Sequence, residues 1–166
     1  MERKIVLSKK ILVAYFSAGG ATARPASVLA EAVGGDLFEI RPETPYTRAD
    51  LNWMDRHSRS IVEMMTPGMR PPVTIHMEDM AQYDVIFLGF PVWCDTVPTI
   101  VQTFLEGYDL QGKKIITFAT SGGGGMGHSE REVSASAPGA QVVRGKLMNG
   151  RQTVEGVRQW AAPMAE

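Results

Sequence analysis

The chain has one cysteine, no long apolar run and no excess of either charge, and each shortage removes a class of protein. With Cys94 as the single cysteine, no internal disulfide can form, which favours the cytoplasm over an oxidising compartment. No apolar run approaches the roughly 18 residues that a membrane span needs. Seventeen basic residues balance 18 acidic ones, so the net charge of −1 gives no support for nucleic-acid binding.

What remains is the composition of an ordinary globular domain. The chain has 166 residues, of which 44% are hydrophobic and 21% are charged. This length suffices to bury a substantial core, and no internal repeat or linker interrupts it. We therefore expect one domain over residues 1–166, with neither nucleic acid nor membrane as a partner.

The N-terminal stretch MERKIVLSKKILVAYFSAGGATA has the order of basic, apolar and small residues of a signal peptide. Ser8, Lys9 and Lys10 divide its apolar part into two pieces. Each piece is shorter than the roughly 7–15 residues of a signal-peptide core. The pattern favours a buried strand over 11–16 and a cytoplasmic location.

Short apolar runs alternate with helical patterns along the chain. Strands are predicted at 11–16, 36–40, 85–90 and 115–119, with a weaker one near 141–144. The runs ILVAYF, VIFLGF and IITFA are nearly continuous, as in strands that are covered on both faces.

Apolar residues at helical spacing predict four helices, at about 28–33, 51–65, 97–108 and 154–161. Strands that alternate with such helices indicate a parallel sheet in a three-layer α/β domain. The stretch 42–82 is long for a connection, and we interpret it as an excursion with one helix that forms a lid or a dimer contact.

Three unusual loops follow predicted strands: SAGGAT after 11–16, PVWCDTVP after 85–90 and TSGGGGMGHS after 115–119. Right-handed crossovers bring the carboxyl ends of parallel strands to one edge, where open α/β sheets bind ligands. Each loop alone also has an ordinary explanation. Ser17 or Thr22 can cap a helix, Trp93 can pack in a core or interface, and Gly122–Gly125 can be a connector.

Together the loops predict a mononucleotide site. Exposed N–H groups at a helix start bind phosphate, and small residues let it approach closely. The indole of Trp93 can stack on a flat ring, and the glycine-rich third loop can bring N–H groups to its polar edge. No Walker motif, Rossmann fingerprint or nucleophile elbow is present, and Cys94 and the three histidines show no metal-site spacing.

The segments ILVAYFSAGGAT, VIFLGFPVWCDTVP and IITFATSGGGGMGHS resemble the FMN-binding segments of flavodoxin-like proteins, particularly the short-chain flavoprotein group. The resemblance extends over most of residues 10–150. It implies a doubly wound five-stranded parallel sheet of order 2-1-3-4-5 and FMN as the cofactor.

The resemblance also implies which residues bind FMN. The phosphate would be held by residues of the first loop: Ser17, Gly19, Gly20, Ala21, Thr22 and Ala23. The isoalloxazine ring would lie between the second loop, with Pro91, Val92, Trp93, Cys94 and Asp95, and the third, with Thr120, Ser121, Gly122, Gly123, Gly124 and Gly127.

The chain departs from the family pattern at several of these positions. Gly19 and Ala21 stand where the family has hydroxyl or amide side chains, so two donors to phosphate are lost. Each lost hydrogen bond should weaken the binding free energy by roughly 0.5–1.5 kcal/mol. Arg24 either compensates by its charge or is a solvated helix residue. Cys94 and Asp95 replace a Trp-Gly pair, which removes one aromatic wall and places a carboxylate near the flavin.

Three functions compete on this evidence. The first is an FMN-dependent oxidoreductase that passes electrons from NAD(P)H to quinones or similar small acceptors. The second is an electron carrier for protein partners, which the near-neutral charge counts against. The third is a flavodoxin-like binding module without redox activity. Because the flavin carries the redox step, we name no catalytic residue; His128 either assists or is structural. A homodimer is also expected from the excursion and the resemblance.

Overall fold

The computed structural model describes residues 9–166; residues 1–8 of the predicted domain lie outside the described part. Five parallel strands form one sheet in the order β2-β1-β3-β4-β5, which confirms the predicted fold. The strands are β1 (Ile11–Tyr15), β2 (Asp36–Glu39), β3 (Val85–Pro91), β4 (Lys114–Thr120) and β5 (Gln141–Leu147).

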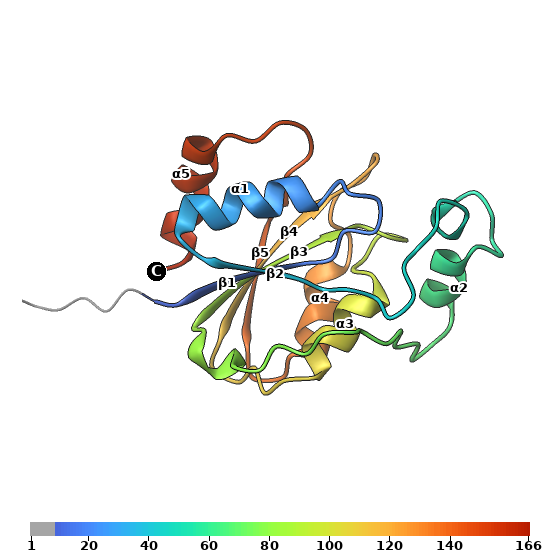
Figure 1. Ribbon diagram of the computed structural model, residues 1–166, viewed down its shortest axis with the longest axis horizontal. Coiled ribbons are helices and arrows are strands. Elements are labelled where there is room, and N and C mark those ends of the chain that lie inside the picture. Colours follow the sequence, from blue (N-terminus) through green and yellow to red (C-terminus); the bar gives the residue numbers. More distant parts are fainter. Residues whose placement is uncertain (1–8) are drawn as a thin grey trace, which may run out of the picture.

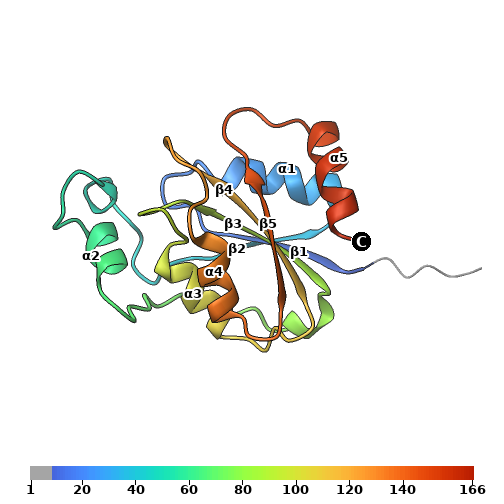
Figure 2. The same ribbon diagram turned by 180° about the vertical axis from the view of Figure 1, so that it is seen from behind.

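Helices cover both faces of the sheet (Figure 1). On one face lie α1 (Ala23–Val33) and α5 (Val154–Met164), and on the other lie α3 (Thr99–Glu106) and α4 (Ser129–Ser136). The reverse view shows the same three layers (Figure 2). A hydrophobic cluster fills the space on each side of the sheet, so the central strands are covered on both faces, as their continuous apolar runs predict.

The excursion lies beyond the carboxyl ends of the strands and extends away from the three layers in both views (Figures 1 and 2). It carries a short 3₁₀ helix, η1 (Ala49–Leu51), and α2 (Arg59–Met65); a second 3₁₀ helix, η2 (Met80–Gln82), precedes β3.

The prediction of one helix over 51–65 is wrong in its first half, because α2 begins only at Arg59. The side chain of Asn52 accepts a hydrogen bond from the N–H of Met54 at 3.1 Å, and that of Asp55 accepts one from His57 at 2.9 Å. Such local bonds offer the backbone a turn in place of a helix. The apolar spacing of this segment does not reveal that competition.

The helix α4 was not predicted from the sequence. Its sequence, SEREVSAS, buries only Ser129, Val133 and Ser136, so it shows no apolar stripe. Elsewhere the predicted elements differ from the observed ones mainly at their ends. No helix within residues 9–166 is long and apolar enough to cross a membrane.

We expect Gly145→Ala to destabilise the fold at the edge strand β5. A Cβ at this position would lie 1.7 Å from the carbonyl oxygen of Thr117 on β4, beside the point where the register of the two strands shifts. The loss of unfolding free energy should reach the upper end of the range of about 1–3 kcal/mol that overpacking causes. Urea unfolding followed by circular dichroism measures it.

Gly122→Ala is the matched control, because a Cβ at Gly122 meets no atom within 4 Å and the residue does not have a positive φ. Equal unfolding free energies for the two variants would contradict the argument.

Candidate functional site: three loops at the carboxyl edge of the sheet

The three unusual loops lie at one edge of the sheet because they follow β1, β3 and β4, which are neighbours in the strand order. Parallel pairing aligns the ends of these strands: Tyr15 pairs with Gly89, and Pro91 pairs with Thr120. The loops are residues 16–22, 91–98 and 121–128. We call them the first, second and third loop.

The first loop is shaped as a cradle of backbone N–H groups. The Ser17 Oγ accepts hydrogen bonds from the N–H groups of Thr22 and Ala23, at 3.2 and 3.1 Å, which folds the loop over the start of α1. Gly20 has a φ of 91°, which side chains rarely tolerate. The N–H groups of Gly19, Gly20 and Ala21 bond to no residue between 9 and 166. These donors, together with the start of α1, suit an anion.

A buried pair of threonines joins the first loop to the end of β4. The hydroxyls of Thr22 and Thr120 are 2.8 Å apart, and both residues are buried. This bond uses the proton of only one hydroxyl, so the second hydroxyl keeps a proton to donate. Thr22 was predicted as a phosphate ligand, and Thr120 was predicted near the ring. The structure places them side by side.

The second loop is a tight turn that contacts the third loop. Trp93 and Thr96 exchange two backbone hydrogen bonds, at 2.9 and 3.0 Å, around Cys94 and Asp95. These two residues have φ values of 50° and 61°, the left-handed region in which residues other than glycine are uncommon. The carbonyl oxygen of Asp95 accepts a hydrogen bond from the N–H of His128 at 2.7 Å.

Gly127 makes that contact between the loops sterically feasible. A Cβ on Gly127 would lie 1.8 Å from the carbonyl oxygen of Asp95, and the residue has a φ of 56°. The second loop also joins the end of β4, since the N–H of Val92 donates to the carbonyl of Thr120 at 2.8 Å. Hydrogen bonds therefore connect the end of β4 to the first and second loops, and the third loop to the second.

Trp93 belongs to a cluster of three aromatic rings. Its ring centroid lies 5.5 Å from that of Phe16 and 5.4 Å from that of Tyr46, both edge to face. Phe16 follows β1, and Tyr46 lies in the excursion. The indole is half-buried and also lines a cavity, so it has both the packing role and the site position that the sequence left open.

A cavity of about 570 Å³ lies between the excursion and the second and third loops. This volume is within the range of small-molecule sites. One side is formed by residues 92–95 and 121–124, all predicted as binding residues. The other side comes from the excursion and was not predicted; its residues are Leu51, Trp53, Ser60, Ile61 and Met64. Apolar residues in a connection carry no signal that distinguishes a cavity wall from ordinary packing.

Within the excursion, a clamp made of Glu63 and Arg59 from α2 holds Tyr46, whose ring in turn contacts Phe16 and Trp93. The Tyr46 hydroxyl donates to Glu63 at 2.5 Å, and the Arg59 Nε donates to the other oxygen of Glu63 at 3.0 Å. The Arg59 guanidinium also lies 3.8 Å from the centre of the Tyr46 ring. Burial, with the hydrogen bond to Glu63, raises the pKa of Tyr46 far above its usual value, so the phenol stays protonated.

Asn149 is a further residue that the sequence analysis missed. Its side chain accepts from the N–H of Ser121 at 2.8 Å and donates to the carbonyl of Ser121 at 3.0 Å, which braces the start of the third loop. A single asparagine in a loop gives no sequence signal of a contact 28 residues away.

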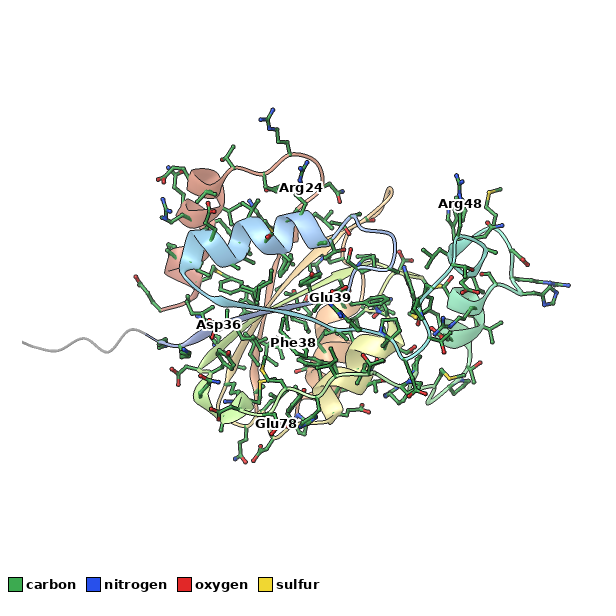
Figure 3. The ribbon with its side chains drawn as sticks, viewed as in Figure 1. Arg24, Asp36, Phe38, Glu39, Arg48 and Glu78 are labelled. Carbon is green, nitrogen blue, oxygen red and sulfur yellow. The ribbon has the colours of Figure 1, made fainter. Side chains whose placement is uncertain are left out.

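The remaining candidates lie at the margins of the site. Arg24 is exposed on α1 (Figure 3) and lines a separate hollow with Arg151, away from the cavity. His128 is exposed. Partial burial and the charge of Asp95 raise the pKa of the Cys94 thiol, so the reactive thiolate is disfavoured at neutral pH. Within residues 9–166, no group of three or more potential ligands is placed to hold a metal ion.

Comparisons with known proteins agree with this geometry. The family model described as Flavodoxin matches residues 10–164. Among curated proteins, no match was found.

Two crystal structures of a "putative flavoprotein" are similar over nearly the whole chain. The one from Bacteroides eggerthii is 47% identical, with a TM-score of 0.88, over 95% of this chain and 99% of its own. The one from Bacteroides uniformis is 45% identical, with a TM-score of 0.87, over 94% and 99%. A flavoprotein from Lactobacillus acidophilus, crystallised in complex with FMN, shares the fold at 21% identity and a TM-score of 0.67, over 92% and 99%.

The threonine pair leads to a test of how the first loop is held. We expect Thr120→Val to lower the free energy of unfolding by about 1–3 kcal/mol, because it leaves the buried hydroxyl of Thr22 without its partner. The double variant Thr22→Val with Thr120→Val should lose less unfolding free energy than the two single variants lose in sum. Urea denaturation of the four proteins gives the coupling energy, and strict additivity would show that the two hydroxyls do not interact.

Proposed function

The chain belongs to the flavodoxin family, and we propose that it binds FMN and works as an oxidoreductase that passes electrons from a nicotinamide donor to a quinone-like or other small acceptor. The observation that carries this proposal is the joining of three loops beside one cavity. The first loop offers anion donors, and the other two line a space with an indole and a glycine-rich backbone.

The first loop suits the FMN phosphate although no lysine or arginine belongs to it. The N–H groups of Gly19, Gly20 and Ala21, which have no partner among residues 9–166, would act as donors, supported by the positive end of α1. The proton left over from the Thr22–Thr120 pair is a further donor. In this assignment the backbone and the buried hydroxyl pair compensate for the side chains that Gly19 and Ala21 lack.

The second and third loops suit the isoalloxazine ring. We assign Trp93, Cys94 and Asp95 to one side of the ring and Thr120–Gly124 with Gly127 to its other edge. With FMN bound there, the carboxylate of Asp95 would disfavour the build-up of negative charge on the ring. Because the turn at Cys94 and Asp95 is tied to Gly127 and His128, these residues orient the ring as one unit.

Bound FMN supplies the electron-transfer chemistry, and the chain supplies position and electrostatics. The loops would bind and orient the cofactor, while Trp93 of the aromatic cluster and the excursion line the cavity beside it. We assign no acid–base residue, and the protonated thiol of Cys94 is not assigned a redox role.

The small net charge of −1 favours an enzyme over a carrier for protein partners. A carrier finds its partner through a strong charge of one sign, which this chain lacks. We also propose the cytoplasm as its location, since Cys94 is a single free thiol. Homodimerisation stays a prediction from the excursion at 42–82 and the family resemblance.

FMN binding is tested by the purified protein itself. We expect a yellow protein that releases FMN on denaturation, with Trp93→Ala weakening FMN binding by about 1–3 kcal/mol, or roughly 5- to 150-fold in Kd. Trp93→Phe keeps an aromatic ring and should lose much less. Isothermal titration of the apoprotein measures the three affinities. If the protein takes up no FMN from an excess of the cofactor and is itself colourless, only the binding-module function remains.

Turnover separates the enzyme from the carrier. With FMN bound, we expect steady oxidation of NADH or NADPH once a quinone such as menadione is added, followed by absorbance at 340 nm. FMN binding without any such turnover would favour the carrier.

A further inference from the structure

We propose that the cavity side of the excursion is the wall against which the electron acceptor lies. We further propose that the reacting part of this acceptor is a flat ring without negative charge. The wall consists of Leu51, Trp53, Ser60, Ile61 and Met64. The inference rests on the proposed function, because FMN held by the loops would face this wall across the cavity.

The wall has the chemistry of an apolar ring site. Three of its five side chains are aliphatic or thioether, and a fourth is an indole. Such side chains gain most from removing apolar surface from water, and they offer a charged ligand no partner. The only polar side-chain groups among the five are the hydroxyl of Ser60 and the indole N–H of Trp53, and neither carries a charge.

The charge of the cavity selects against anions. Of the described residues that line it, Asp95 alone has a charged side chain, and no lysine or arginine is among them. An anionic ring would lose its hydration beside this carboxylate without gaining a cation. An uncharged or cationic ring meets no such penalty.

Arg59, the cation of helix α2, which also carries three of the wall residues, is engaged elsewhere. Besides its bond to Glu63, it donates to the carbonyl oxygen of Thr44 at 2.8 Å and lies 3.7 Å from Asp50. Releasing it for a ligand would break the clamp that holds the wall, since Glu63 is buried with only 7% of its surface exposed.

Trp53 is the residue of the wall best suited to stack on a ring. It lines the cavity, yet 77% of its surface is exposed, and it forms no aromatic pair within residues 9–166. Its neighbour Met54 is equally exposed, at 78%, but does not line the cavity. The two residues thus form a matched pair for mutation.

The first experiment measures steady-state kinetics of the FMN-loaded protein with NADPH and two acceptors, menadione and the anionic 1,2-naphthoquinone-4-sulfonate. We expect menadione to have the lower KM. Trp53→Ala should raise the KM for menadione about 5- to 10-fold and leave the Kd for FMN unchanged, as expected for the loss of one stacked ring. Met54→Ala should leave both values unchanged.

The second experiment measures binding without turnover, by equilibrium dialysis of the same two quinones against the protein without NADPH. Trp53→Ala should weaken menadione binding by the same factor, and Asp95→Asn should narrow the preference for menadione over the sulfonate. Asparagine tolerates the positive φ of this position, so the turn should keep its shape.

The inference is overturned if Trp53→Ala and Met54→Ala behave alike, or if the wild-type protein prefers the sulfonate. Failure of the wild-type protein to bind FMN would instead refute the proposed function. The dialysis measurement would then still test whether the wall binds an uncharged ring.

Discussion

The parallel pairing of β1, β3 and β4 is the constraint on which the rest of the site depends. Parallel strands end at the same edge, so three loops that come from different parts of residues 16–128 meet there without any bond between them being required first. The apolar runs that form these strands are buried on both faces, and this burial keeps the ends in place. The contacts between loops then refine an arrangement that the sheet already imposes.

Two of those contacts share one residue, Thr120, at the end of β4. Its hydroxyl meets Thr22 of the first loop, and its carbonyl accepts from Val92 of the second. The close approach of Asp95 to Gly127 then joins the second loop to the third. Direct contacts therefore connect all three loops through the end of β4, which suits a cofactor whose phosphate and ring are held by different loops.

Much of the fold and about half of the cavity were predictable, for reasons that differ between residues. The strands were found because their apolar runs are local signals, and Trp93, Ser121 and the glycines were found because they follow such runs directly. The helix α4 escaped because its buried face is made of serines and one valine. Asn149 and the clamp of Tyr46, Arg59 and Glu63 escaped because their partners are distant or belong to an irregular segment.

The sequence by itself determined the layered α/β architecture, the edge at which the loops meet and the type of ligand they suit, since each follows from local patterns and the handedness of crossovers. Only the tertiary structure decided that the excursion lines the cavity beside the loops, because that depends on the contact of Tyr46 with Trp93 and on the buried carboxylate of Glu63. These contacts join segments whose own patterns do not point to each other. The loop side of the cavity was thus readable in the chain, whereas its opposite wall exists only through packing.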